Sequence, residues 1–155
     1  MIPSIQIVVD ADACPVKEEA AKVATRHGLV IHFVSNSHMR LPLGDNVKRV
    51  VVAGGVDAAD DWIAEHAGAG DIVVTADIPL ASRAIKKSAR VLSHAGKPFT
   101  EDSIGMALAM RDLMAQLRET GEVRGNNPVF TPADRSKFLQ GLENAVQATK
   151  RASAG

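Results

Sequence analysis

A short apolar run near the start of the chain ends in two acidic residues and constrains the fold more than any other segment. Residues 5–9 are rich in β-branched side chains, which is typical of a strand buried on both faces. Asp10 and Asp12 follow, and Pro15 stands where a helix can begin, because a first helical turn does not need its missing N–H. This order places Asp10 and Asp12 at the carboxyl end of a strand, the edge where open α/β sheets bind ligands.

Apolar strands and amphipathic helices alternate along the chain, which predicts an α/β fold with a mostly parallel central sheet covered by helices. The expected strands span residues 5–9, 29–35, 47–53, 71–75 and 89–93, and the expected helices span residues 15–27, 57–67, 79–87 and 101–120, with a last helix from Thr131 onward. The two last helices are expected to pack on the sheet or on each other. Residues 1–150 are expected to form a single domain, and residues 151–155 a disordered tail.

Acidic residues return at two further junctions between a strand and a helix. Asp57, Asp60 and Asp61 begin the helix expected after the third strand, and Thr75 and Asp77 follow the fourth strand. In a parallel sheet these junctions open on one edge, so the side chains are expected to converge with the acids of the first junction. Carboxylates gathered in this way repel one another unless a divalent cation or a shared proton compensates.

Three of these acids also have an ordinary structural explanation. Aspartate is a good N-cap, and Asp12, Asp57 and Asp77 each precede an expected helix. Asp57 and Asp60 also resemble a capping box at the positive end of a helix dipole. Helix capping therefore stays open for these positions, and a solvated surface position stays open for Asp61.

The ligand type of the acidic cluster indicates which metal would bind. Oxygen ligands suit Mg²⁺ or Mn²⁺ better than Zn²⁺. The expected ligands are Asp10, Asp57, Asp60 and Asp77, and Asp12 is expected to be a further ligand or the base that orients water. The histidines show no metal-ligand spacing. A carboxylate-bound Mg²⁺ commonly activates water against a phosphodiester, which points to hydrolysis.

The composition argues against several other classes of protein. Lys and Arg together number 18, as do Asp and Glu, so no overall basic field attracts nucleic acid, and the 3% aromatic content offers few platforms for base stacking. Cys14 is the single cysteine, so an internal disulfide framework is impossible. The sequence shows neither a signal peptide nor an apolar run approaching a membrane span, so a cytoplasmic location without a membrane partner is expected.

Three segments together resemble one known family. They are Val9-Asp-Ala-Asp-Ala-Cys-Pro15, Gly55-Val-Asp-Ala-Ala-Asp-Asp-Trp-Ile63 and Gly70-Asp-Ile-Val-Val-Thr-Ala-Asp-Ile-Pro-Leu-Ala81. They look like the signature segments of the bacterial YaiI/YqxD family (UPF0178, DUF188), which is similar to the PIN-like nuclease superfamily. The resemblance covers nearly the whole chain. It implies a three-layer α/β/α PIN-like fold with an acidic, metal-dependent site.

The resemblance assigns the acids of a PIN-like site to residues of this chain. The acids of the first strand, the helix and the fourth strand correspond, in that order, to Asp10 with Asp12 beside it, Asp57 with Asp60, and Asp77. Asn36 and Thr75 correspond to supporting polar positions at the same edge. Many PIN domains have one acid in the first turn, so the pair found here departs from that pattern.

The leading hypothesis is a Mg²⁺- or Mn²⁺-dependent nuclease that acts on RNA or another phosphodiester. The five acids Asp10, Asp12, Asp57, Asp60 and Asp77 would form its catalytic centre. The expected substrate-binding residues are Lys17, Asn36, Thr75 and Arg83. For Arg83 the ordinary alternative is a solvated helix face. The oligomeric state stays open.

Two other functions stay open. One is a non-catalytic module that uses the acids only to bind a metal or RNA, which the zero net charge and scarce aromatic residues favour. The other is an aspartyl-phosphate phosphohydrolase, because an Asp-x-Asp after a first strand also supplies a nucleophile and an acid in that class, although no cap-domain segment is evident. A phosphatase built on Cys14 fails, because Ala20 stands where the Cys-x5-Arg loop needs arginine, and Cys14 is expected to be a buried structural thiol.

Overall fold

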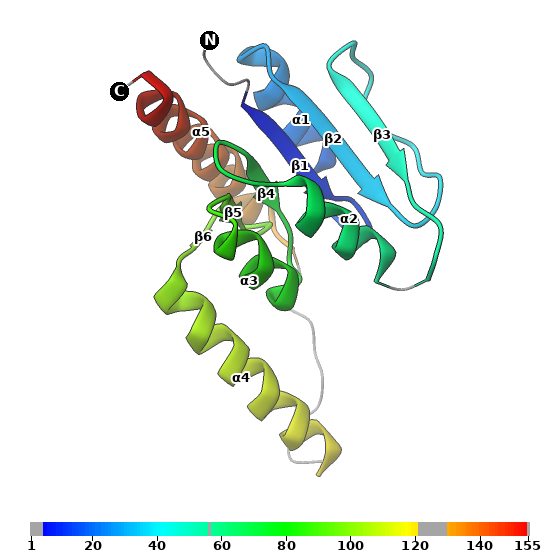
Figure 1. Cartoon of the computed structure of the whole chain (residues 1–155), viewed down its shortest axis with the longest axis vertical. Coiled ribbons are helices and arrows are strands. Elements are labelled where there is room, and N and C mark those ends of the chain that lie inside the picture. Colours follow the sequence, from blue (N-terminus) through cyan, green and yellow to red (C-terminus); the bar gives the residue numbers. More distant parts are fainter. Residues whose placement is uncertain (1–4, 56, 121–129, 155) are drawn as a thin grey trace.

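The computed structural model describes residues 5–55, 57–120 and 130–154, in which a central sheet lies between layers of helices (Figure 1). The strands of this sheet are β1 (Gln6–Asp10), β2 (Val30–Ser35), β3 (Val47–Val51), β4 (Ile72–Val74), β5 (Arg90–Leu92) and β6 (Pro98–Phe99). Their spatial order is β3-β2-β1-β4-β5-β6. All pairings among β1–β5 are parallel, and β6 pairs antiparallel to β5. The predicted mostly parallel α/β sheet is confirmed.

Strand β1 lies in the middle of the sheet, between β2 and β4. Ile7, Val8 and Val9 are fully or almost fully buried, as the apolar run predicts for a strand covered on both faces. Ile7 and Val9 belong to the core on one face, and Val8 belongs to the core on the other. This alternation ties both cores to one strand.

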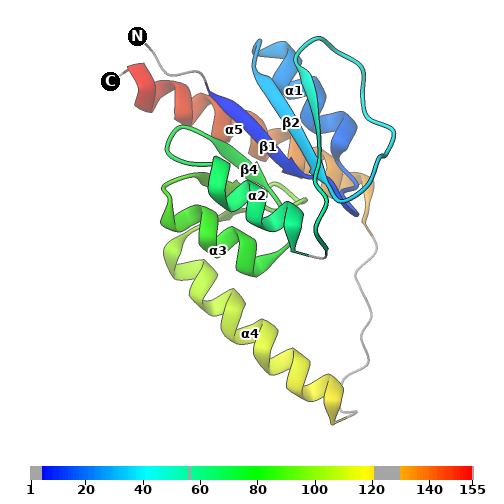
Figure 2. The same ribbon diagram turned by 45° about the vertical axis from the view of Figure 1, so that its right-hand side comes forward.

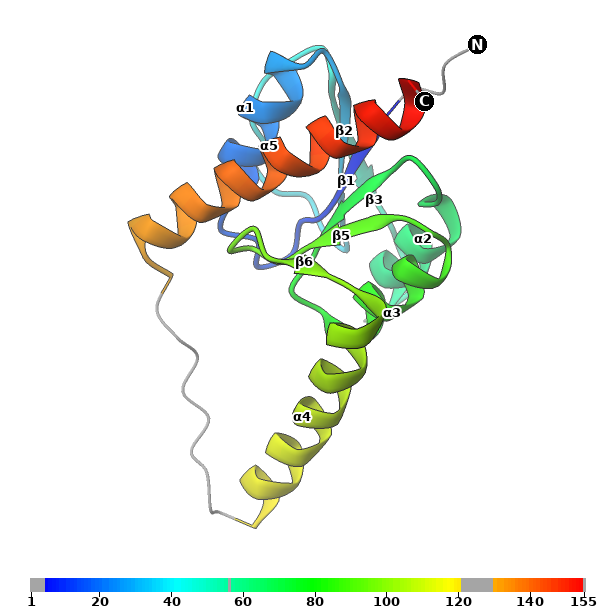
Figure 3. The same cartoon turned by 90° about the vertical axis from the view of Figure 1, so that its left-hand side faces the viewer.

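Helices cover both faces of the sheet, which gives the expected three layers (Figures 2 and 3). The helices are α1 (Lys17–Arg26), α2 (Ala58–His66), α3 (Ile78–Lys86), α4 (Glu101–Glu119) and α5 (Pro132–Ala154). Apolar side chains of α1 and α5 pack on one face, and those of α2 and α3 pack on the other. In the part of the chain described, no helix is both long and apolar enough to cross a membrane.

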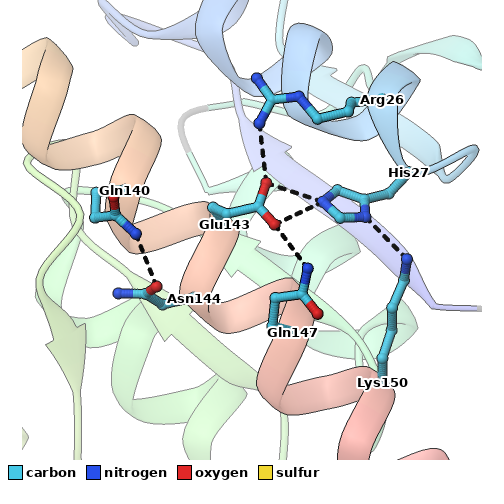
Figure 4. A network of polar contacts seen from close by, with 7 residues as sticks. All are labelled: Arg26, His27, Gln140, Glu143, Asn144, Gln147 and Lys150. Atoms are coloured by element: carbon cyan, nitrogen blue, oxygen red, sulfur yellow. Dashed lines mark hydrogen bonds and ion pairs between the residues drawn. The ribbon is translucent and has the colours of Figure 1, made fainter.

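A polar network joins the end of α1 to the middle of α5 (Figure 4). Lys150 Nζ lies 2.8 Å from His27 Nδ1, and because an ammonium group only donates, Nδ1 must be the acceptor. His27 Nε2 then donates to the carboxylate of Glu143 at 2.9 Å. Arg26 and Gln147 also donate to Glu143, and these donors, His27 above all, lower the pKa of the Glu143 carboxyl. The network fixes the first and last helices to each other.

Helix α4 differs from the expected packing. Its start is fixed by a capping box, in which Thr100 and Ser103 exchange side-chain and backbone hydrogen bonds. Within this helix Ile104 is buried, and it packs into the hydrophobic core that α2 and α3 form on their face of the sheet. Met106, Met110 and Leu113 are 77%, 57% and 47% exposed, so the expectation that this helix packs on the sheet is wrong beyond its first turns.

Several element boundaries also differ from the sequence prediction. The short antiparallel β6 was not predicted, and the connection 36–46 joins two parallel strands without a helix. Helix α1 begins at Lys17 rather than at Pro15. Helix α5 continues through Ala154, so residues 151–154 are helical where a tail was expected. The segment between α4 and α5, which the sequence predicts to be a polar loop over residues 122–128, lies outside the described residues.

Two glycines let the turn between β5 and β6 approach α5 closely. Gly96 has a φ of +77°, which favours glycine, and its backbone lies directly against α5. A methyl group at Gly141 would overlap the carbonyl oxygen and Cα of Gly96. The absence of a side chain at Gly141 is therefore a packing requirement, even though it lies inside a helix.

This contact reverses the usual effect of replacing a helical glycine. Gly141→Ala should lower the free energy of unfolding by about 1–3 kcal/mol, the usual range for overpacking. Gly105→Ala is the matched control, because nothing lies within 4 Å of its added Cβ, and it should raise stability by roughly 1 kcal/mol. Urea unfolding of both variants tests the pair, and stabilisation by both would contradict the described contact.

Candidate functional site

The carboxyl ends of β1 and β4 form the centre of the candidate site. Asp10 is the last residue of β1, and Thr75 follows the last residue of β4. Val9 and Val74 are paired in the parallel register, so Asp10 and Thr75 are neighbours at the same edge. Asp77 follows two residues later as the N-cap of α3. The parallel sheet thus brings together two junctions that lie far apart in the sequence.

Thr75 joins the two acids through its hydroxyl. Its Oγ1 donates to Asp10 Oδ2 at 2.9 Å and accepts from the Asp77 amide at 3.0 Å. The residue is completely buried. Because the buried hydroxyl donates to one acid and accepts from the backbone of the other, Thr75 positions both acids.

Burial and neighbouring charges act together on Asp10. Burial, the largest effect, raises the pKa of its carboxyl, and the charges of Asp60, Asp77 and Asp12 raise it further. The hydrogen bond from Thr75 opposes these effects, and the resulting pKa is about 6. The acids of all three junctions are therefore close enough to influence one titration.

Helix α2 contributes the second group of acids. Burial raises the pKa of Asp60, as do the charges of Asp77 and Asp57, whereas Arg83 lowers it. Asp57 occupies the N-cap position of α2, but its side chain makes no capping hydrogen bond, so the capping alternative is wrong for Asp57. Asp61 is exposed and accepts from Arg83 Nη1 at 2.8 Å, which is a surface ion pair.

Asp77 and Asp12 have different hydrogen-bonding roles. Asp77 Oδ1 accepts from the Leu80 amide at 2.9 Å, so Asp77 does cap α3. Asp12 Oδ2 instead accepts from the Asn36 amide at 3.1 Å, across the turns that follow β1 and β2. Since Val16 is the N-cap of α1, the capping alternative is wrong for Asp12. Asn36 lies at the edge and holds Asp12 through its backbone.

A pocket of about 260 Å³ is lined by Asp77 and the acids of the α2 end, but not by Asp10 or Asp12. The lining comes from the beginning of α2, from α3 with its N-cap, and from α4, and consists of Asp57, Asp60, Asp61, Asp77, Pro79, Leu80, Arg83 and Arg111. Arg111 is the residue of this site that sequence reasoning missed. The sequence predicts α4 as a helix but gives no signal that the helix runs alongside α3.

The carboxylates form an electrostatic cluster rather than a preformed coordination sphere. Among the described residues, no three His, Cys, Asp or Glu side chains are placed so that they could hold one metal ion. The donors at the edge are nevertheless all carboxylate oxygens, the ligand type of Mg²⁺ and Mn²⁺.

The turn after β1 also contains Cys14, and Lys17 begins α1 directly after this turn. Burial raises the pKa of the Cys14 thiol to about 11, so the thiol stays protonated near neutral pH. This agrees with the expected structural role of the cysteine. Lys17 Nζ donates to the Cys14 carbonyl oxygen at 3.0 Å, so the lysine is tied to this turn.

Together, the fold and the edge define an α/β protein with an acidic site where the parallel strands end. Residues 8–148 match the family described as "Uncharacterized BCR, YaiI/YqxD family". A UPF0178 protein of Parvibaculum lavamentivorans is 64% identical to this chain, over 94% of this chain and 96% of its own length. A UPF0178 protein of Rhodospirillum rubrum is 59% identical, over 95% of this chain and 99% of its own length. The chain belongs to the YaiI/YqxD (UPF0178) family, as the three signature segments predicted.

The hydroxyl of Thr75 should control the titration of Asp10. Thr75→Val preserves the volume but removes the donor to Asp10, so the pKa of Asp10 should rise further. Carboxyl-carbon NMR titration measures this pKa. Thr75→Ser retains the hydroxyl and should leave the pKa near its wild-type value. Equal pKa values in all three proteins would contradict the role assigned to Thr75.

The raised pKa of Asp10 also predicts how stability depends on pH. Without a bound metal, the folded protein binds this proton more tightly than the unfolded chain, so the contribution of Asp10 to stability is largest below the ordinary pKa of 3.8 and is lost as the pH rises through about 6. Asp10→Asn removes this titration. Its stability relative to the wild type should therefore increase from pH 4 to pH 7 by about 1–2 kcal/mol, after allowance for solvent screening. Urea unfolding in EDTA tests this, and a difference that does not change with pH would contradict it.

Proposed function

We propose that this protein is a Mg²⁺- or Mn²⁺-dependent phosphodiester hydrolase, a nuclease that acts on RNA. The observation that carries the proposal is the convergence of acids at the end of β1, where Thr75 joins Asp10 to Asp77 and where burial and three other carboxylates raise the pKa of Asp10 to about 6. Such perturbed acids concentrate at functional sites, because repulsion of this kind costs stability. A divalent cation would offset the repulsion. The resemblance to PIN-like nucleases that the sequence segments imply points to the same reaction.

The donor set fits a hydrated hard cation. The residues that would hold it, directly or through its bound waters, are Asp10, Asp57, Asp60 and Asp77, whose carboxylates offer only oxygen atoms. Mg²⁺ commonly binds proteins through one or two carboxylates, keeps several waters and takes further oxygens from substrate phosphates. A preformed group of three protein ligands is therefore not a requirement for this type of site.

The residues around the edge would have different roles in hydrolysis. When bound, the cation supplies an acidified water and neutralises charge on the phosphodiester. Thr75 holds Asp10 in place, and the Leu80 amide holds Asp77, so both carboxylates are oriented before any ligand arrives. Asp12 is held by the backbone amide of Asn36 and is the acid we assign to orient the attacking water.

Arg83 is the substrate-binding residue that the geometry supports best among those expected from the sequence. It lines the acidic pocket and pairs with Asp61 at the surface. A phosphate could replace Asp61 as its partner, because guanidinium groups bind phosphate and carboxylate in the same way. Lys17, by contrast, donates to the Cys14 carbonyl oxygen and does not line the acidic pocket.

Calorimetric titration with Mn²⁺ tests the metal site. The wild type should bind Mn²⁺, whereas Asp10→Ala and Asp77→Ala should each weaken binding by at least about tenfold, as expected when one of few ligands is lost. Asp45→Asn is the matched control, because Asp45 is an exposed acid just before β3, at the opposite end of the strands. Absence of binding to the wild type would contradict the proposal.

Cleavage of end-labelled RNA in the presence of Mn²⁺ then tests the reaction. The wild type and Asp45→Asn should cleave, and the two site variants should not, although circular dichroism should show that both are folded. Mn²⁺ and RNA binding without cleavage would instead identify a non-catalytic module. Trapping of a fluoro-metal adduct on Asp10 would identify an aspartyl-phosphate phosphohydrolase.

A further inference from the structure

Helix α4 runs alongside α3 and then extends away from the rest of the molecule (Figures 1 and 2). It is anchored near its start, where Ile104 is buried with Leu80 and Ala84 of α3. Further along the helix, Arg111 lines the acidic pocket together with Arg83 and the acids of α2 and α3. An element outside the sheet therefore contributes a positive charge to the edge where the strands end.

The spacing along α4 places three residues on one side of the helix. Ile104, Arg111 and Arg118 are seven residues apart, which is about 20° less than two full turns and about 10 Å of helix length per step. Because Ile104 faces the body, Arg111 and Arg118 lie on that same side. Arg111 reaches the pocket, and Arg118 lies about 10 Å further out along the helix.

These two arginines differ from Arg83 in their partners. Arg83 pairs with Asp61, whereas within the described residues neither Arg111 nor Arg118 is paired with a carboxylate. Both are exposed. The nearest acids along α4, Asp112 and Glu119, lie about 100° around the helix from them. The side of α4 that faces the pocket is therefore positively charged.

We propose that Arg111 and Arg118 bind two phosphates of one polynucleotide strand, with Arg111 at the reacting phosphodiester and Arg118 beyond it. The proposal rests on the proposed hydrolase function and defines its substrate as a polymer rather than a small phosphodiester. A strand advances about 3.4 Å per nucleotide in a duplex and further when extended, so about three nucleotides or fewer span the two arginines. A mononucleotide ester would reach Arg111 alone.

Cleavage of a short and a long substrate separates the two contacts. The substrates are bis(p-nitrophenyl) phosphate and 20-nucleotide single strands of RNA and of DNA, all with Mn²⁺. Arg118→Ala should lower kcat/KM for the strands by roughly threefold to tenfold and leave the small ester unchanged. Arg111→Ala should lower both by about tenfold or more, since a charged hydrogen bond is lost at the reacting group.

Salt dependence and conservative variants distinguish binding from structural effects. For each arginine removed, the slope of log kcat/KM against log salt should become shallower by about 0.7, the value for one phosphate contact of a single strand. Arg118→Lys should retain most of the activity on the strands, because a point charge suffices at that distance from the reaction. Arg151→Ala, an equal change of charge at the end of α5, is the matched control and should behave as the wild type.

The outcomes separate this inference from the proposed function. Arg118→Ala with unchanged activity on the strands, or with an equal loss on the small ester, would overturn the inference while the hydrolase function stands. Activity of the wild type on the small ester alone would do the same. If the wild type cleaves none of the substrates, the hydrolase function fails. Fluorescence anisotropy of the labelled strands then measures whether Arg111 and Arg118 contribute to binding. Weaker binding by Arg111→Ala and Arg118→Ala than by Arg151→Ala would support them, and equal binding would overturn them.

Discussion

The half-buried carboxylate of Asp10 at the end of the central strand is the constraint on which the rest of the site depends. Removing this carboxylate from water raises its pKa, and the acids around it raise the pKa further. A single hydroxyl, that of Thr75, opposes both effects. Asp10 therefore occupies a position where its negative charge is destabilised, and the fully buried Thr75 holds it there.

Helix capping and a role in the site are not exclusive explanations for these aspartates. Asp77 caps α3 through Oδ1, and its own amide donates to Thr75, so the cap itself fixes Asp77 beside Asp10. Asp57 has the position of a cap without the hydrogen bond, and its charge contributes to the raised pKa of Asp60. A cap orients one carboxylate oxygen toward its helix, which makes the direction of the whole side chain predictable.

Sequence reasoning predicted what depends on neighbouring residues along the chain. It predicted the two strands whose ends hold Asp10 and Thr75, from the apolar segments 5–9 and 71–75. The apolar pattern of these segments reflects burial on both faces of the sheet. It did not predict the path of α4, because one buried residue, Ile104, anchors that helix and the rest of its apolar side chains do not reveal a direction. It missed β6, since a two-residue strand has no periodicity to detect. The position of Arg111 in the site could not be predicted either, because it depends on the path of α4.

The combination of charges at the edge explains why the acids and the arginines belong to one site. Carboxylates alone repel a phosphodiester, and the exposed pair of Arg83 with Asp61 contributes little to stability. With a cation among the acids, the same edge would attract phosphate, and Arg83 and Arg111 would then contact oxygen atoms that the cation leaves unbound. Helix α4 buries little of its own surface and carries Arg111 to this pocket, which is the placement that the proposed contact with phosphate requires.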